Sequence, residues 1–560
     1  MGAVHLNSAV NVGGFEFNNS TMTSFSSSSI AITNGNITFT NSKTTGAFSS
    51  GAITLSNGGM TVPAWSGGNF STGNISMTGN LSFNNWTTGT LTCGTISSTN
   101  GNVSIDNKTA GNTNLALNLT NGSFSVLNST GWTLTFNNTC TVGSLLVDLS
   151  PIAINFASTY NFTSNGDFSI LNSATNFSNS GTLSVRGNFT LNSNCTFTQN
   201  NYVIFTAVTT GKTITSAGKS FSNVRFNGSG GEWILQDAFK VTSVTEHYTG
   251  IFRSNGKSVD YGLTFNADDN GTVRTLDLTG TDTIRVGYLY RINTSGSTVY
   301  TAGSSVLLMQ TSAATDLTLE GGGKTFGAVV IKNLNSSNNQ YYIFFRDNNT
   351  IYGNVTIAIH NRSFLYFDGS NNTFGNFSLH YNQATIATVS ESTILYSHNF
   401  GNFTITTNGL LPQLYCGSNN SFGQVSLPAG TNWRINQAST QSLKGLTAVG
   451  DCQKLIYLYS TNSSVSANIA DSDGGSNTLE FMRFNRINFS GASWTANNTL
   501  ESINTSGITV NPPATQTYYW IGGTGNWNDP TKWSLSSGGP AVNCLPTRVD
   551  HVVFDNNSFP

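Results

Sequence analysis

Short segments of alternating apolar and polar residues recur along the first 190 residues of this chain, each directly after a glycine. In the segment 79–83 (GNLSF), Leu81 and Phe83 point to one side and the polar residues to the other. This period of two is typical of a strand with one buried face. A second alternating run precedes many of the glycines, for example residues 115–117 (LAL) before Gly122. Each repeat is therefore expected to contain at least two short strands joined by Asn, Gly and Ser turns.

The glycines return at a nearly constant spacing of 20 to 24 residues, at Gly14, Gly35, Gly59, Gly79, Gly101, Gly122, Gly143, Gly166 and Gly187. A repeat of this length is one coil of a solenoid. Leucine-rich repeats share the period, but their Leu-x-x-Leu-x-Leu pattern is absent and strong helix formers are scarce. We therefore predict an all-β fold, a parallel β-solenoid of the right-handed β-helix type with coils of about 21–26 residues. Equivalent strands of consecutive coils would lie about 4.8 Å apart.

The repeat returns in a second form later in the chain, where an aromatic residue precedes the glycine. The segments are 326–329 (FGAV), 352–355 (YGNV), 374–377 (FGNF), 400–403 (FGNF) and 422–425 (FGQV), with glycines 26, 22, 26 and 22 residues apart. Asn pairs lead into several of them, at residues 348–349, 371–372 and 419–420. Stacked coils would turn these residues into an aromatic ladder and an amide ladder. The alternative is that the asparagines only form turns.

These differences predict four regions. Residues 1–200 form a regular solenoid, residues 201–325 a less regular one, and residues 326–510 an aromatic-glycine solenoid. Residues 511–560 comprise a proline-containing linker and the start of a further module.

Charged residues make up only 9% of the chain, and the net charge is −2. No electrostatic case exists for nucleic acid or for an anionic membrane. No segment is apolar and long enough to insert into a membrane, and no signal peptide is visible. Residues 51–100 carry no charge at all, so amides and hydroxyls must keep that surface hydrated. This suits an extracellular protein on a cell surface, whose partners could be surface glycans, other surface proteins or further copies of the chain.

Several motifs that invite a chemical interpretation are expected to be structural. The six cysteines (Cys93, Cys140, Cys195, Cys416, Cys452 and Cys544) are scattered and are interpreted as buried apolar residues without a disulfide framework. The Gly-Lys-Thr/Ser motifs at residues 211–213, 218–220 and 323–325 lack the earlier glycine of a phosphate loop. Asp471-Ser472-Asp473-Gly474 lacks the later ligands of a calcium loop. The histidines, including His360 and His380, show no metal spacing, and no cofactor is predicted.

Asp347 and Asp368 are the best candidates for catalysis. Parallel β-helices include polysaccharide lyases and glycosidases, in which carboxylates of neighbouring coils act together. Asp347 and Asp368 are 21 residues apart, and each precedes an Asn-rich turn. No acidic row continues in the next coils, near Ser397 and Cys416. Turn capping by the two aspartates is the favoured interpretation, and no catalytic, cofactor or metal residue is assigned.

The last region contains a distinct cassette. Residues 518–530 (YYWIGGTGNWNDP) are followed by Trp533, Pro546, residues 550–555 (DHVVFD) and Phe559. At these residues, 518–559, the chain resembles the repeat-module openings of very large surface proteins and adhesins of Bacteroidota, and similar modules of phage fibres. The resemblance implies extracellular display and adhesion, and it carries no catalytic residues. Trp520, Trp527 and Trp533 could form the core of the module or stack on sugars.

The sequence therefore predicts a non-enzymatic structural and adhesive repeat protein that forms a rod or fibre on a bacterial cell surface. A phage tail fibre or other virion appendage is the first alternative. A carbohydrate-active β-helix enzyme is the second.

Overall fold

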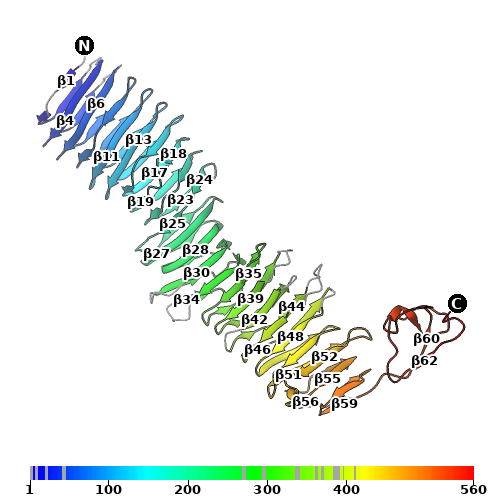
Figure 1. The fold of residues 1–560 in the computed structure, drawn as a ribbon. Coiled ribbons are helices and arrows are strands. Elements are labelled where there is room, and N and C mark those ends of the chain that lie inside the picture. The colour runs from blue at the N-terminus through cyan, green and yellow to red at the C-terminus, as the bar shows by residue number, and fades with distance from the viewer. Residues whose placement is uncertain are drawn as a thin grey trace. The chain divides into compact units, whose positions relative to one another are not determined.

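The computed structural model of the chain describes residues 4–6, 10–18, 23–40, 46–267, 273–292, 298–334, 341–359, 363–367, 371–381, 391–394, 396–408 and 411–559. Parallel strands of these residues stack from coil to coil (Figure 1) and form a β-solenoid of about 20 turns, which confirms the predicted fold class. Within the described ranges there is no α-helix, only the short 3-10 helix η1 (Pro530–Lys532). The chain divides into two compact units, residues 1–285 with 295–303 (unit 1) and residues 286–294 with 304–560 (unit 2).

Each regular coil of unit 1 contributes strands to three faces. The first face starts directly after the repeated glycines and contains β3 (Phe15–Asn18), β5 (Ile37–Thr40), β7 (Met60–Val62), β10 (Leu81–Asn84), β12 (Val103–Asp106), β14 (Ser123–Leu127), β17 (Ser144–Asp148), β20 (Phe168–Leu171), β23 (Phe189–Thr190) and β26 (Lys212–Thr215). The second face includes β8 (Phe70–Thr72), β15 (Thr133–Phe136), β18 (Ala153–Phe156), β21 (Asn176–Asn179) and β24 (Thr196–Gln199). The third face includes β9 (Ile75–Met77), β16 (Cys140–Val142), β19 (Phe162–Ser164), β22 (Leu183–Val185) and β25 (Tyr202–Phe205).

Longer strands connect these faces. β4 (Ser24–Ile32), β6 (Ala47–Leu55), β11 (Leu91–Ser98) and β13 (Thr113–Leu119) run from the second face into the third. β27 (Ser220–Leu235) and β28 (Phe239–Arg253) pair with each other over ten register positions with three irregularities. The alternating runs that precede the glycines thus form strands, as predicted, and each coil has one strand position more than the minimum of two.

Most of the repeated glycines stack on one another from coil to coil, and Gly58 takes the place expected for Gly59 in this stack. The Gly79 N–H donates to the Gly58 carbonyl at 2.8 Å, and the Gly143 N–H donates to the Gly122 carbonyl at 2.7 Å. A Cβ atom on Gly101 would lie 1.9 Å from the Gly79 carbonyl oxygen, far inside van der Waals contact. Only glycine permits so close an approach of two backbones. The regular spacing of glycines is therefore a packing requirement of the stacked coils.

The outward positions of the first face of unit 1 form a column of hydroxyl side chains, which we call the hydroxyl column. Register pairs Thr61 with Ser82, Ser82 with Ser104, and Ser104 with Ser125. The column consists of Thr38, Thr61, Ser82, Ser104, Ser125, Ser169, Thr190 and Thr215, with Leu146 as its one apolar member. Register continues the column to Glu16 at its start, and elsewhere in the column hydroxyls rather than charges keep the surface hydrated.

The inward positions of unit 1 form a core of stacked aromatic rings. Phe25, Phe48 and Phe70 are fully buried and stack one coil apart, with ring centroids 4.9 and 4.5 Å apart. Trp65 and Trp86 stack at 5.2 Å. Parallel register places equivalent side chains over one another, so a ring in one coil packs on the ring of the next.

One lysine interrupts this apolar core. Lys108 is fully buried, and its Nζ lies 4.7 Å from the ring centre of Trp86 and 5.3 Å from that of Trp132. Among the described residues Nζ has no hydrogen-bond partner, so the two rings provide its polar environment. Burial lowers the pKa of Lys108 from 10.5 to about 7.

Unit 2 repeats the three faces with different side chains. Its third face contains β33 (Leu289–Ile292), β36 (Leu317–Glu320), β39 (Tyr341–Arg346), β42 (Ser363–Phe367), β45 (Glu391–Ile394), β48 (Gln413–Cys416), β50 (Asn432–Ile435), β52 (Ile456–Ser460), β55 (Met482–Asn485) and β58 (Glu501–Ile503). The first face includes β37 (Thr325–Phe326), β40 (Thr350–Ile351), β43 (Thr373–Phe374) and β46 (Asn399–Phe400). The second includes β35 (Val306–Thr311), β38 (Ala328–Asn333), β41 (Val355–Ile359), β44 (Phe377–Tyr381) and β47 (Phe403–Thr407).

The predicted aromatic ladder is present in unit 2, with one member different. Phe374 stacks on Phe400 at 4.9 Å, and Phe400 stacks on Phe422 at 5.0 Å. Tyr352 was expected in the same ladder, but its side chain is 76% exposed and Ile351 pairs with Phe374 instead. Inward positions alternate along a strand, so an aromatic residue shifted by one position points to solvent.

The predicted amide ladder is also confirmed, and it is buried. The Asn349 N–H donates to Oδ1 of Asn372 at 2.7 Å, and the His398 N–H donates to Oδ1 of Asn420 at 3.1 Å. His398 occupies the position between them, where its Nδ1 accepts from the Asn372 N–H at 3.2 Å. Burial lowers the pKa of His398 to about 4, so a neutral ring fills the place of an amide.

We expect Gly101→Ala to destabilise unit 1, because the new methyl group would collide with the Gly79 carbonyl in the preceding coil. Overpacking of this kind costs about 1–3 kcal/mol or more. Hydrogen exchange of β10, β12 and β14 should show faster local opening in the variant. Ser104→Ala, an outward change in the same coil, is the control and should alter stability by less than about 0.5 kcal/mol. Equal exchange rates in both variants would contradict the packing argument.

Lys108→Met should change the pH dependence of stability. The pKa of Lys108 falls from 10.5 in the unfolded chain to about 7 in the fold, so between these pH values the unfolded chain binds one more proton. The free energy of unfolding of the wild type therefore rises with pH across this window. Below the window Lys108 is charged in both states, and the full cost of burying this charge destabilises the fold. The methionine variant should be more stable at pH 7 and should lack this rise. Urea midpoints from pH 7 to 10.5 measure the slope, and parallel slopes in both proteins would refute the assignment.

Candidate functional site

The outward positions of the third face of unit 2 carry rings and guanidinium groups in place of hydroxyls. Register aligns Phe344 with Tyr366 in one column and Tyr342 with Phe364 in the column beside it. Their rings are half-buried and lie 5.4 to 5.7 Å apart in neighbouring pairs. The Arg346 guanidinium lies 4.5 Å from the centre of the Phe344 ring. This group packs mainly ring on ring, and each ring remains partly exposed.

A second group of the same kind lies further along the same face. Register aligns Tyr415 with Arg434 and Arg434 with Tyr459, while Tyr457 aligns with Arg483. The Arg434 guanidinium lies 4.4 Å from the Tyr415 ring, and the Arg483 guanidinium lies 4.8 Å from the Tyr457 ring. We call the two groups together the aromatic-arginine face. The side chains of residues 391–393, which lie between the groups in register, are outside the described residues.

Ion pairs hold several charges of this face. Glu320 lies between two arginines, bonding Arg291 and accepting from Arg346 Nη1 at 3.0 Å. Burial raises the pKa of Glu320, but the hydrogen bonds from the two arginines outweigh burial, so its pKa is lowered overall. Arg483 forms an ion pair with Glu501. The four described arginines of this face outnumber its two described glutamates, so the ion pairs offset only half of its positive charge.

Of the two aspartates considered for catalysis, the structure describes only Asp347. Asp347 follows β39 with a left-handed φ of 69°, and its Oδ2 accepts from the Gly322 N–H at 3.3 Å. Burial is the main cause that raises the pKa of Asp347, and nearby Glu320 adds to it. Asp368 lies outside the described residues, so its distance from Asp347 stays a prediction. The carboxylate of Asp347 thus bonds the preceding coil, and its role as a turn cap stays a prediction.

The other motifs singled out in the sequence are turns where the structure describes them. Asp471 Oδ1 accepts from the N–H groups of Asp473 at 3.1 Å and Gly474 at 2.7 Å, which forms a compact polar turn. Gly211, with φ of 78°, directly precedes the strand β26 and not a helix. In the described part of the chain, no group of three or more His, Cys, Asp or Glu side chains could hold a metal ion. His360 lies outside that part.

The cassette forms a small core of its own. Its three-stranded sheet contains β60 (Thr517–Trp520), β61 (Trp533–Ser534) and β62 (His551–Val553). Trp520 and Trp533 are buried and pack edge to face at 5.0 Å, which confirms the interpretation of these two rings as core. Trp527 is 47% exposed. No helix of the described residues is long and apolar enough to cross a membrane.

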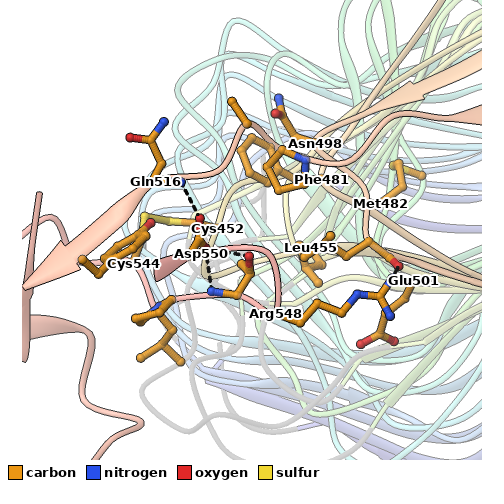
Figure 2. A pocket seen from close by; sticks show the side chains of 17 residues that line it. Cys452, Leu455, Phe481, Met482, Asn498, Glu501, Gln516, Cys544, Arg548 and Asp550 are labelled. Atoms are coloured by element: carbon orange, nitrogen blue, oxygen red, sulfur yellow. Dashed lines mark hydrogen bonds between the residues drawn. A yellow bond between two sulfur atoms is a disulfide. The ribbon is translucent and has the colours of Figure 1, made fainter. Parts of the chain in front are cut away.

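A cavity of about 660 Å³ lies between the cassette and the last coils of the solenoid in unit 2. Figure 2 shows Leu455, Phe481 and Met482 on the solenoid side and Arg548 and Asp550 on the cassette side. This volume lies within the usual range for small-molecule sites of about 300–1,000 Å³. Sequence patterns could not reveal the cavity, because its two walls come from segments far apart in the chain.

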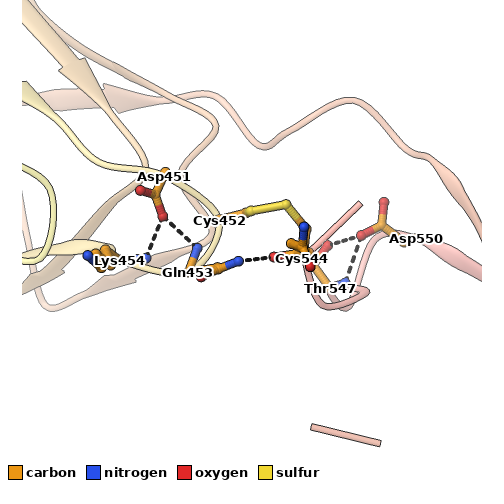
Figure 3. The surroundings of a disulfide bond; sticks show 8 residues. Asp451, Cys452, Gln453, Lys454, Cys544, Thr547 and Asp550 are labelled. Carbon is orange, nitrogen blue, oxygen red and sulfur yellow. Dashed lines mark hydrogen bonds between the residues drawn. A yellow bond between two sulfur atoms is a disulfide. The ribbon is translucent and has the colours of Figure 1, made fainter. Parts of the chain in front are cut away.

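A disulfide between Cys452 and Cys544 closes one side of this cavity (Figure 3). The expectation that no disulfide forms is therefore wrong for this pair. The 92 residues between the two cysteines hide the pairing in the sequence, and only the return of the cassette to the turn after β51 (Thr440–Val449) brings them together. The expectation of buried free cysteines is confirmed for Cys93, Cys140, Cys195 and Cys416.

No protein-family model, curated protein or solved structure matches this chain significantly. The geometry described above is therefore the basis for any functional conclusion.

We expect the disulfide to control docking of the cassette without affecting the solenoid. In Cys452→Ser/Cys544→Ser, a cross-link that closes a loop of 92 residues is lost, which in the chain-entropy model contributes about 4–5 kcal/mol. Limited proteolysis should cut the exposed linker, residues 511–516, several-fold faster in the variant, while the far-ultraviolet circular dichroism stays unchanged. Non-reducing peptide maps of the wild type should contain one peptide pair joined through Cys452 and Cys544. Equal cleavage rates would contradict this role.

Proposed function

We propose that this chain is a non-enzymatic structural and adhesive β-solenoid displayed outside the cell, on a bacterial surface, and that it adheres through the aromatic-arginine face of unit 2. The observation that carries the proposal is the contrast between the outward columns. The first face of unit 1 presents hydroxyls, whereas the third face of unit 2 presents half-buried rings with guanidinium groups packed on them. Aromatic residues and arginine are the residue types enriched at the centres of protein interfaces.

The construction of this face suits repeated weak contacts. Parallel register repeats each outward position once per coil, so a partner with a repeating surface can contact several coils at once. Linked weak contacts add up to strong attachment even when each contact alone is weak. The rings are held in place by stacking on Arg346, Arg434 and Arg483, so little side-chain freedom is lost on binding.

Two further observations support an extracellular location. The disulfide between Cys452 and Cys544 belongs to a class of bond that persists mainly in oxidising compartments. Residues 518–559 resemble module openings of Bacteroidota surface proteins.

Adhesion should depend on the aromatic-arginine face. Beads that carry the purified chain are tested for retention on whole bacterial cells and on surfaces coated with neutral polysaccharides. We expect Tyr366→Ser/Arg434→Gln/Tyr459→Ser to lower retention by about tenfold or more, because several linked contacts are removed together. The matched control is Thr61→Ala/Ser104→Ala/Ser169→Ala on the hydroxyl column, which should retain binding.

Three results would overturn the proposal. They are the absence of retention by the wild type on every surface, an equal loss in the control variant, and the release of soluble sugar products from the polysaccharides. Circular dichroism of each variant shows that the solenoid is intact. Light scattering measures the oligomeric state and so distinguishes the surface adhesin from the main alternative, because a virion fibre of this kind is expected to assemble as a trimer.

A further inference from the structure

The cavity beneath the cassette has an apolar interior. Leu455, Phe481 and Leu500 line it from the last coils of the solenoid, and Leu545 and Pro513 line it from the cassette and linker (Figure 2). Leu455 is 41% exposed, so the wall of the cavity keeps apolar surface that a ligand could cover. An apolar ligand body would bury these side chains, which is favourable by about 25 cal/mol per Å² of apolar surface.

Of the charged side chains that line the cavity, Arg548 is the one that has neither a counter-ion nor all of its hydrogen-bonding groups engaged by the described residues. Both oxygens of Asp550 are occupied, since Oδ1 accepts from the Gln516 N–H at 2.9 Å and Oδ2 accepts from the N–H and hydroxyl of Thr547 at 2.7 and 2.6 Å. Glu501 is ion-paired with Arg483. Arg548 donates through Nη2 to the Leu500 carbonyl at 2.6 Å, and it has no carboxylate partner among the described residues.

From these observations we infer that the cavity is a binding site for a small organic anion, a molecule with an apolar aromatic or aliphatic body and a single carboxylate or sulfonate group. The apolar body lies against Leu455, Phe481 and Leu545. The anionic group pairs with the Arg548 guanidinium, whose hydrogen bond to the Leu500 carbonyl fixes its orientation. This site is independent of the aromatic-arginine face and of adhesion.

The disulfide makes this site dependent on redox state. The cassette and the solenoid each supply one wall, and exposed linker residues 511–516 join them. Besides the disulfide, two side-chain hydrogen bonds connect the walls. Gln453 donates to the Asn543 carbonyl (Figure 3), and Arg548 donates to the Leu500 carbonyl. Without the disulfide the two walls separate more readily, and the cavity loses its closed shape.

The test is a fluorescence titration of the full chain with 1-anilinonaphthalene-8-sulfonate, an aromatic anion of the inferred class. The oxidised wild type should bind one molecule per chain with a saturable rise in fluorescence. Arg548→Gln should weaken binding about tenfold or more, because a charge-assisted hydrogen bond is lost. The matched control, Arg434→Gln on the aromatic-arginine face, should bind like the wild type. The neutral analogue N-phenyl-1-naphthylamine should bind the wild type and Arg548→Gln equally.

Two further variants test the cavity itself. Leu455→Trp fills the space and should abolish binding, whereas Cys452→Ser/Cys544→Ser should weaken it to the level of the reduced wild type. The inference is refuted if the wild type shows no saturable binding, if Arg548→Gln binds the anion as tightly as the wild type, or if loss of the disulfide has no effect. Arg548 is exposed, and equal binding of the neutral analogue to wild type and Arg548→Gln shows that the cavity of this variant is intact, so the test stands even if Leu455→Trp does not fold.

Discussion

Backbone hydrogen bonds between equivalent positions of successive coils are the constraint on which this solenoid depends. Each coil pairs with the next in parallel register, so every position along the coil meets its own counterpart one coil away. A side chain must therefore pack against the side chain at the equivalent position of the next coil, and in several columns this is a residue of the same type. Glycine stacks on glycine where backbones approach most closely, phenylalanine stacks on phenylalanine inside, and asparagine bonds the next coil at the turns.

The same constraint separates structure from function along each strand. Inward positions must fill one continuous core, which leaves them little freedom, whereas outward positions need only remain hydrated. The first face of unit 1 uses this freedom for hydroxyls, and the third face of unit 2 uses it for rings and arginines. A binding surface can thus change along the solenoid without any change in the fold that supports it. Buried Lys108 and His398 show that even the core accepts a polar group when neighbouring rings or amides accommodate it.

The candidate sites were much less visible in the sequence than the fold. Residues such as Tyr342, Tyr415 and Tyr457 are scattered, and only the register between coils shows that they share one outward face. A count of outward positions, taken coil by coil after the strands had been assigned, could have found them. The sequence could not have placed Cys452 beside Cys544, or Leu455 beside Arg548. No sequence pattern in the linker indicates that the cassette folds back onto the solenoid.

By itself the sequence determined the all-β parallel solenoid, the period of its coils, the start of each first-face strand and the two ladders of the second repeat form. These features are local or periodic. Because each coil packs against a coil of similar sequence, the repeat itself indicates which residues meet. Tertiary structure alone decided that Ile351 and not Tyr352 joins the aromatic ladder, that a disulfide links the cassette to the solenoid, and that a cavity lies between them. The first depends on a shift of one residue in strand register, and the other two depend on the cassette folding back onto the solenoid. A repeating sequence pattern contains no information about either event.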